Sequence, residues 1–556
     1  MKLLKLVTLF SICYCIISCA SVKSPKAVTF AISKKQPLTE EEKKDWYFKD
    51  IYKDSIPGIS LHKAYDFLNN KKGDTIIVAV IDTELDIAQE DLKNQIWINK
   101  DEIPNNNIDD DNNGYVDDIH GWNFLGTTEK TPIIHHKSTA VRILNKYNKY
   151  KNVKESEVKS SDLESFKLYK RALNYQKEKI DEAKLNLKYF QGFKERFLSL
   201  RDTMKTLFNK EKFTVKELDS LSKKSNDSII KVKISSTKYL IQNGIDEKRV
   251  NQIISIHKNN LDMTYNLEHD DRLTDDDLDD INDSIYGNNN VRGTAKMDHG
   301  TKVAGVIAGN RFNEYGVIGI TNKVRIMPVV ISSFGNENDK DIALAIRYAV
   351  NNGAKVINMS IGKEFSINEK WIREAIIYAD KKDVLIISAA GNEGLNLDTK
   401  DIFYYPNDMD KDKNEFSNNF IAVGSSNYTE NIVSNFSNYG QTTVDVFAPG
   451  EEIKVLTNDG VGEDSGSSLS CAVVSGIASL IRSYYPALTA KEVKELILKS
   501  GISVDTDVYA PVSEGQKRNP NKVPFSSLSK SGKIVNAYNA LLMAEEVSKK
   551  KKRRKK

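Results

Sequence analysis

Residues 75–82 read Thr-Ile-Ile-Val-Ala-Val-Ile-Asp, a continuous apolar run that is rich in β-branched side chains and ends on a carboxylate. A run without alternating polar positions predicts a strand that is buried on both faces, as in parallel sheets. Further apolar runs predict strands at 324–330, 354–359 and 384–389, and helix-like segments at 341–351 and 367–381 lie between them. This alternation predicts an α/β fold with a doubly wound, mostly parallel sheet flanked by helices.

Residues 148–265 interrupt this pattern, because they are rich in Lys, Glu, Leu and Tyr and contain no proline. Two sets of side chains recur every seven positions: Phe166, Leu173, Ile180 and Leu187, and Tyr169, Ala183, Phe190, Phe197 and Met204, the second broken by Gln176. Heptad spacing predicts a long helix with a coiled-coil-like seam. Thr214 and Glu217 have capping-box spacing and predict the start of a second helix. We expect an inserted α-helical hairpin, a spacer or lid; a dedicated binding site is the alternative.

The composition is that of a folded protein, with 556 residues, 40% hydrophobic and 28% charged. It excludes collagen-like, disulfide-framework and wholly disordered proteins. The net charge is +4, but residues 549–556 carry eight of the 81 basic side chains, and Lys2 and Lys5 carry two more. The remaining 71 basic residues face 77 acidic ones. A strongly basic nucleic-acid-binding domain is therefore excluded. We expect the tail to be solvated and disordered; contact with anionic lipid is the alternative.

The N-terminal segment indicates export. Met1–Ser18 has the lysines and the short apolar core of a secretion signal, too short for a clear spanning helix. Residues 16–19 read Ile-Ile-Ser-Cys, which resembles a bacterial lipobox, whose cysteine carries lipid; an ordinary cleaved signal is the alternative. We expect a protein of the bacterial cell envelope, anchored to a membrane through Cys19 or secreted. Of the four cysteines, only Cys471 would lie in the folded body, so we expect no disulfide.

Four short motifs place polar side chains where buried strands end or helices begin. Asp82 ends the first strand, and His299 opens the helix-like segment MDHGTKVAGVIAG, whose small residues allow close packing. Asn392 follows a strand in AAGN, and Ser468 opens a helix in GSSLSCAVVSG. A serine at a helix N-terminus lies beside free N–H groups in a positive potential. Each motif alone has an ordinary structural explanation, such as capping, but the set in this order favours a shared chemical function.

These motifs resemble those of the subtilases, the subtilisin-like serine proteases, whose triad has the same chain order of Asp, His and Ser. Three more segments agree: residues 358–362 (NMSIG), 434–440 (SNFSNYG) and 444–450 (VDVFAPG). The resemblance covers residues 46–147 and 290–545, and the insertion and lipobox are similar to those of Bacteroidetes lipoprotein subtilases. It implies a subtilisin-like fold with a signal peptide (1–18), a tether (19–45), a catalytic domain in two parts (46–147 and 266–547), the insertion (148–265) and a basic tail (548–556).

The resemblance implies a serine endopeptidase that cleaves proteins or peptides through an acyl-enzyme. Ser468 would be the nucleophile, His299 its general base and Asp82 the carboxylate that orients the imidazole. Asn392 would bind the oxyanion. Ser360, Ile361 and Gly362 would pair with the substrate main chain. We expect a monomer that needs no cofactor for catalysis and binds no nucleic acid.

Several positions depart from the usual subtilase pattern. Glu84 stands where glycine is common, Gln89 and Lys302 where histidine is, Ser467 for threonine and Ala472 for proline. None of these changes removes a triad or oxyanion group, so they bear on pocket shape and efficiency. The alternatives to a serine endopeptidase are a catalytically silent scaffold protein of the envelope and an esterase or amidase. We expect Cys471 to be a small packing residue rather than a second nucleophile.

An acidic loop indicates calcium. The pattern Asp109-x-Asp111-x-Asn113-Gly114-x-x-Asp117 has oxygen ligands at positions 1, 3, 5 and 9 of an EF-hand-like loop. Tyr115 would supply a main-chain carbonyl at position 7, but His120 stands at position 12, where a glutamate is expected. We predict a structural calcium site formed by Asp109, Asp111, Asn113, Tyr115 and Asp117; a solvated turn is the alternative. We expect a second acidic run, at 275–283, to be a solvated loop.

Overall fold

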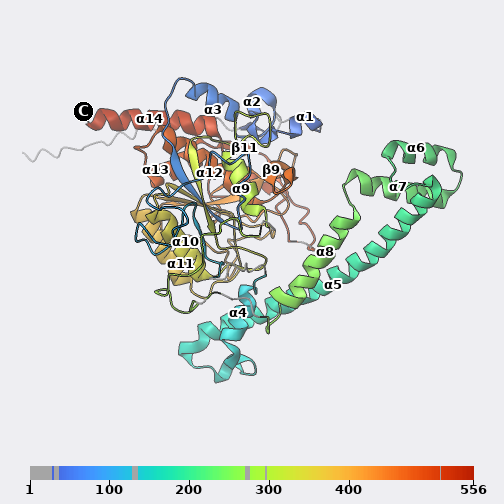
Figure 1. Ribbon diagram of the computed structural model, residues 1–556, viewed down its shortest axis with the longest axis horizontal. Coiled ribbons are helices and arrows are strands. Elements are labelled where there is room, and N and C mark those ends of the chain that lie inside the picture. The colour runs from blue at the N-terminus through green and yellow to red at the C-terminus, as the bar shows by residue number, and fades with distance from the viewer. Residues whose placement is uncertain are drawn as a thin grey trace, which may run out of the picture.

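The computed structural model describes residues 28–29, 37–127, 135–269, 274, 276–294, 297–513 and 515–555. The predicted signal segment and Cys19 lie outside these residues. A ten-stranded sheet crosses the body in the order β1-β11-β14-β8-β7-β6-β5-β2-β4-β3 (Figure 1). All its neighbouring strands run parallel except β11 and β14. The predicted α/β fold with a mostly parallel sheet is therefore confirmed.

The strands of this sheet are β1 Val28–Thr29, β2 Ile76–Asp82, β3 Trp122–Asn123, β4 Val324–Val330, β5 Val356–Met359, β6 Leu385–Ala389, β7 Phe420–Ser426, β8 Val446–Pro449, β11 Ile502–Asp505 and β14 Lys533–Ile534. Two small antiparallel sheets pair β9 Ile453–Thr457 with β10 Gly460–Asp464, and β12 Asp507–Val508 with β13 Val523–Pro524. The helices of the body are α1 Glu40–Lys43, α2 Ile51–Asp54, α3 Leu61–Leu68, α4 Thr139–Lys146, α9 His299–Ala308, α10 Asp339–Asn351, α11 Glu369–Lys381, α12 Ser467–Tyr484, α13 Ala490–Ser500 and α14 Ala537–Lys555.

Strand β2 shows why the decisive stretch is apolar throughout. Val78 and Val80 belong to the core on one side of the sheet, together with residues of α9, α12, α13 and α14. Ala79 and Ile81 belong to the core on the other side, with α10 and α11. Because both faces are covered, no position of the strand favours a polar side chain. The four predicted strands are confirmed as β2, β4, β5 and β6.

The C-terminal region differs from its prediction. Residues 533–534 form β14, and the last helix, α14, begins at Ala537. The expected disordered tail is wrong for residues 548–555, which continue α14. Lys551 Nζ donates to the Ala487 carbonyl at 2.9 Å and to Glu492 at 2.6 Å, so the basic segment has partners on the body.

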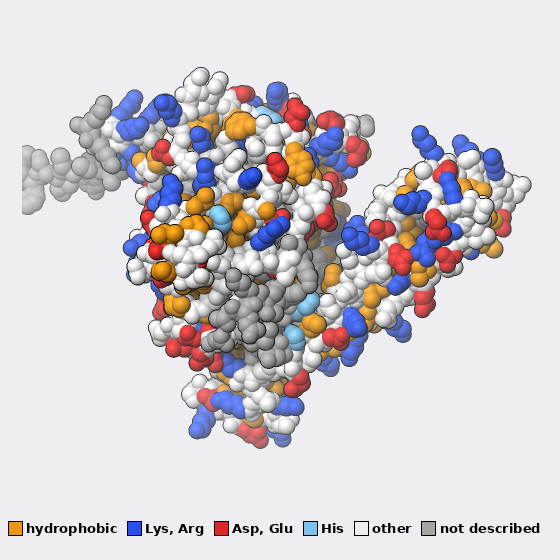
Figure 2. All heavy atoms as spheres, viewed as in Figure 1, with side chains coloured by type: hydrophobic (Ala, Val, Ile, Leu, Met, Phe, Trp, Pro, Cys, Tyr) orange, Lys and Arg blue, Asp and Glu red, His pale blue; other side chains and the backbone are white. Residues whose placement is uncertain are grey.

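The insertion forms an arm (residues 163–264) that projects from the body (Figure 1). The 46-residue helix α5, Leu163–Phe208, runs outward, and α6 Val215–Lys224, α7 Ser228–Gln242 and α8 Glu247–Asn259 return. The long helix and the capping box at Thr214 and Glu217 are confirmed, but three helices rather than one make the return. Figure 2 shows basic and acidic side chains spread over the arm, as on a solvated surface.

Half of the six buried residues of α5, namely Tyr169, Ala183 and Met204, belong to the second heptad set. In the first set Phe166 is buried and Leu173 is exposed. Gln176, which interrupts the pattern, is itself buried, because its amide donates to the Tyr265 carbonyl at 3.0 Å. The chain just before α4 meets the end of the arm where Ser138 N donates to Thr264 O at 2.8 Å. The base of α5 also packs on the body, because Phe166, Tyr169 and Ala172 share a hydrophobic cluster with Phe365. Within the described ranges, no helix is long and apolar enough to cross a membrane.

Candidate active site

Asp82 lies at the carboxyl end of β2, between β5 and β4, and is fully buried. Its main-chain carbonyl accepts from the N–H groups of Ile331 at 3.0 Å and Ser332 at 3.2 Å. Its carboxylate Oδ1 accepts from Thr83 N at 2.7 Å. The backbone and one carboxylate oxygen of Asp82 are therefore fixed by the strand ends around it, at the edge where ligand sites of parallel sheets collect.

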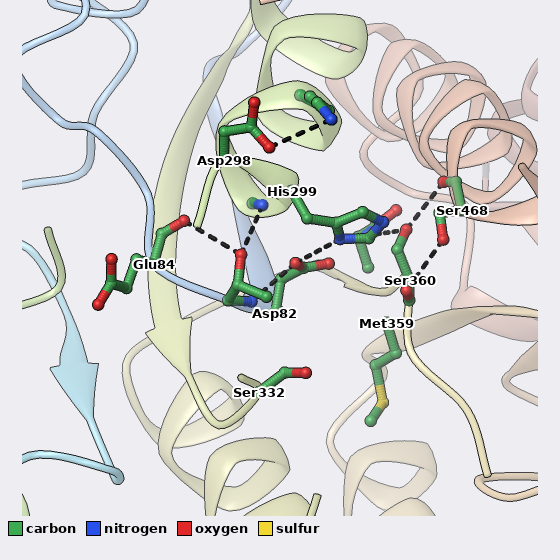
Figure 3. Close-up of polar contacts among 12 residues, drawn as sticks. Asp82, Glu84, Asp298, His299, Ser332, Met359, Ser360 and Ser468 are labelled. Atoms are coloured by element: carbon green, nitrogen blue, oxygen red, sulfur yellow. Dashed lines mark hydrogen bonds and ion pairs between the residues drawn. The ribbon is translucent and has the colours of Figure 1, made fainter. Parts of the chain in front are cut away.

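His299 opens helix α9 and points its ring at Asp82 (Figure 3). Nδ1 of His299 and Oδ1 of Asp82 lie 2.6 Å apart, although 217 residues separate them in the sequence. Gly300 makes this approach feasible, because a methyl group placed on it would lie 2.7 Å from the Thr83 carbonyl oxygen. Gly300 N also donates to Thr83 Oγ1 at 2.9 Å. The imidazole donates from Nδ1, which leaves Nε2 on the side that faces Ser468.

The groups around His299 change the pKa of its imidazole. Burial lowers the pKa of His299, but the charge of Asp82 and its hydrogen bond outweigh burial, so the pKa is raised above its ordinary value of 6.5. Lys302, which replaces the second expected histidine, opposes this shift. Its ammonium pairs with Asp464 at 2.9 Å and with Asp298 at 3.1 Å. Lys302 is therefore neutralised by Asp464 and Asp298.

Ser468 is the second residue of α12 and faces the imidazole in Figure 3. Its hydroxyl donates to the Ser360 carbonyl at 3.1 Å, and the Ser360 hydroxyl donates back to the Ser468 carbonyl at 2.8 Å. This reciprocal pair fastens the start of α12 to the chain that leaves β5. In the free protein the Ser468 hydroxyl thus points to Ser360 rather than to His299, and catalytic hydrogen bonds are often formed only once substrate is bound.

Asn392 follows β6 in a tight turn in which Gly391 has φ = +105°. Gly391 N donates to Ser467 Oγ at 3.2 Å, and Asn392 Oδ1 accepts from Ser467 N at 2.8 Å. Because the side-chain oxygen is occupied, the exposed amide group of Asn392 has its N–H donors left for a ligand. The structure thus brings Asp82, His299, Asn392 and Ser468 to the same edge of the sheet.

The substituted positions have local partners. Glu84 accepts from Thr294 N at 2.8 Å, and Gln89 donates to the Thr457 carbonyl at 3.2 Å. Cys471 is buried against Asn358 and the Ile387 carbonyl. Burial raises the pKa of Cys471 to about 12, so its thiol is neutral at ordinary pH and packs as expected.

The acidic loop is arranged differently from the predicted ligand set. Ligand oxygens of Glu102, Asp109 and Asp111 lie within 4.8 Å of one another. Asp117 turns away, because its carboxylate accepts from Asn106 N at 3.3 Å and Asn107 N at 2.9 Å. The Asn113 amide donates to Asp111 and Asp118, and Tyr115 packs its ring on Trp122. Glu102 lies outside the EF-hand-like spacing, so no local pattern pointed to it.

Comparisons with known proteins agree with this geometry. A model of the subtilase family matches residues 73–526. The cell wall-associated protease of Bacillus subtilis (strain 168) is 33% identical over 223 residues, which are 40% of this chain and 23% of that protein. The thermophilic serine proteinase of Bacillus sp. (strain AK1) is 35% identical over 188 residues, or 34% and 43% of the two chains. The match spans less than half the length of either relative.

Among solved structures, the prenylagaramide maturation protease PagA aligns with 44% of this chain and 82% of its own, at 28% identity and a TM-score of 0.36.

Removing the charge of Asp82 should lower the pKa of His299. In the wild-type protein we expect an NMR titration of the imidazole to give a pKa above 6.5, and a lower value in Asp82→Asn. Lys302→Gln should shift it the other way, because the lysine charge opposes protonation. His299→Gln assigns the resonance. An unchanged pKa in Asp82→Asn would mean that the carboxylate does not act on the imidazole.

Proposed function

Because the chain belongs to the subtilase family, we propose that it is a serine endopeptidase that hydrolyses peptide bonds through an acyl-enzyme. The observation that carries the proposal is the 2.6 Å contact between His299 Nδ1 and Asp82 Oδ1, with Ser468 on the other side of the ring (Figure 3). A silent scaffold would not need all four groups, and here none of them is replaced. The match covers only part of each relative, so the substrates are inferred from this site alone.

In this mechanism the Ser468 hydroxyl turns from the Ser360 carbonyl to His299 Nε2. The oxygen attacks the scissile carbonyl carbon while Nε2 takes its proton, and Asp82 stabilises the imidazolium that forms. The Asn392 amide and the Ser468 main-chain N–H donate to the oxyanion. Collapse of the tetrahedral intermediate breaks the C–N bond, and the imidazolium protonates the leaving amine. Water then hydrolyses the acyl-enzyme by the same steps.

The base must be neutral to accept a proton. The pKa of His299 is raised above 6.5, so activity should fall as the pH drops through this raised pKa.

The acyl side of the substrate would lie along Ser360, Ile361 and Gly362, adding a strand by main-chain hydrogen bonds. The partners are therefore proteins or peptides in an extended conformation.

Replacing the nucleophile should abolish the reaction. Ser468→Ala should lose labelling by a fluorophosphonate probe and peptide hydrolysis, and Asn392→Ala should keep labelling but lose on the order of 10²–10³ in kcat. Ser465→Ala, near the same helix start, serves as control and should keep both. Labelling that persists in folded Ser468→Ala would contradict the assignment of the nucleophile.

We further propose that the protein is exported and anchored through lipid on Cys19. The support is the sequence Ile-Ile-Ser-Cys at the end of an apolar segment. Radiolabelled palmitate should enter the wild-type chain, and the protein should sediment with membranes. Cys19→Ser should lose both properties, whereas Cys13→Ser should keep them. Palmitate labelling of Cys19→Ser at the wild-type level would show that the lipid is attached to another residue.

We also propose a structural calcium site, which takes no part in the reaction steps. Glu102, Asp109 and Asp111 offer hard oxygen ligands within 4.8 Å, and Glu102 is buried. Main-chain N–H groups already donate to these three carboxylates, and a calcium ion, which binds such oxygens, would offset their remaining mutual repulsion. Glu102 joins the proposed set in place of Asp117, because its oxygen lies near those of Asp109 and Asp111, whereas the Asp117 carboxylate accepts from Asn106 N and Asn107 N.

Chelation should lower the melting temperature of the wild-type protein, and calcium should restore it. The double variant Asp109→Asn/Asp111→Asn should melt at one temperature with or without calcium, because the charge that binds the ion is gone. Asp459→Asn, at an exposed turn, should respond to calcium like the wild type. A wild-type melting temperature that ignores chelator and calcium would refute the site.

A further inference from the structure

A tyrosine ring lies between the chains that leave two neighbouring strands of the sheet. β5 and β6 run side by side, with Met359 paired to Ser388, and their continuations carry Gly362 and Gly391. A methyl group placed on Gly362 would lie 2.0 Å from Tyr404 Cε1, and one on Gly391 would lie 2.6 Å from Tyr404 Cζ. The Tyr404 ring therefore touches both backbones and fills the gap between them, which we call the slot.

The slot adjoins the reacting groups. Ser360, two residues before Gly362, exchanges hydrogen bonds with Ser468. Gly391 N donates to Ser467 Oγ at 3.2 Å, and Asn392 follows directly. Both walls of the slot are thus tied to the first turn of α12, where the nucleophile lies.

The proposed substrate pose directs one side chain into the slot. The scissile carbonyl carbon must lie at Ser468 Oγ with its oxygen at Asn392, while the acyl-side main chain follows Ser360 to Gly362. Successive side chains of an extended peptide point to opposite sides. The residue that supplies the scissile carbonyl then points between the two glycine-bearing walls, where the Tyr404 ring lies.

Tyr404 is held at both ends. Its hydroxyl donates to Glu393 Oε1 at 3.3 Å, and the other oxygen of Glu393 accepts from Asn438 Nδ2 at 2.6 Å. Next to it in the chain, Tyr405 exchanges two main-chain hydrogen bonds with Lys363, at 3.0 Å and 2.8 Å. These contacts anchor the backbone of Tyr404 to one wall and its hydroxyl to the rim of the other.

We propose that Tyr404 restricts cleavage to bonds whose carbonyl belongs to a small residue: glycine, alanine or serine. The inference rests on the proposed peptidase function and concerns its substrate class. A larger side chain would need the space that the ring occupies. In a filled pocket, even one excess methylene costs roughly 10–200-fold in kcat/KM.

The test uses the full chain and two peptides that differ only in the residue before the scissile bond, alanine or phenylalanine. For the wild type, kcat/KM should be at least about 100-fold higher for the alanine peptide. Tyr404→Gly, which empties the slot, should reduce this ratio at least tenfold by accelerating the phenylalanine peptide. Tyr404→Phe keeps the ring and should keep the preference. Tyr315→Gly removes an exposed tyrosine elsewhere and should change neither rate constant.

Mass-spectrometric mapping of cleavage in a peptide library checks the bond position for each variant, and circular dichroism checks folding. Wild-type cleavage after phenylalanine and alanine at similar rates would overturn the inference, as would a ratio that a folded Tyr404→Gly leaves unchanged. In either case loss of cleavage in Ser468→Ala keeps the peptidase function. If no peptide is cleaved and no fluorophosphonate labels the wild type, the proposed function itself fails.

Discussion

The 2.6 Å contact between His299 Nδ1 and Asp82 Oδ1 is the constraint that the rest of the fold must satisfy. Its two residues come from a central strand and from a helix that packs on it, and a shift of about 1 Å between these elements would break their hydrogen bond. The continuous apolar strand β2 fixes one side, buried between two cores. Gly300 fixes the position of His299, because it lets α9 approach the main-chain carbonyl of Thr83.

The arm lies between these two residues in the sequence, yet it does not disturb their contact. The end of the arm returns beside the start of α4, where Ser138 N donates to Thr264 O. The base of the arm also contacts the body: the Tyr175 hydroxyl donates to Glu364 at 3.0 Å, two residues beyond Gly362. The cation–π contact of Arg171 with Phe365 lies beside it. The insertion is therefore joined to the chain that follows the proposed substrate strand.

Asp82, His299, Asn392 and Ser468 could be predicted because each lies in a short motif whose strand end or helix start is visible in the sequence. Tyr404 and Glu102 could not, since their places depend on loops that cross from elsewhere in the fold. Gln176 interrupts the predicted seam, but its hydrogen bond to the Tyr265 main-chain carbonyl allows its burial. The tail was predicted from its own charge, whereas its structure depends on Glu492 and Ala487, distant in sequence. Local patterns predicted the strands and the candidate reacting groups, whereas the other features depend on tertiary contacts.

The most direct test of the central claim is to trap the acyl group on the enzyme. The full chain is mixed rapidly with an activated peptide ester that ends in alanine, quenched with acid, digested and mapped by tandem mass spectrometry. We expect a burst of one leaving group per active site and an acyl group on Ser468 alone. An acyl group on another residue, or peptide hydrolysis without any acyl-enzyme, would contradict the account.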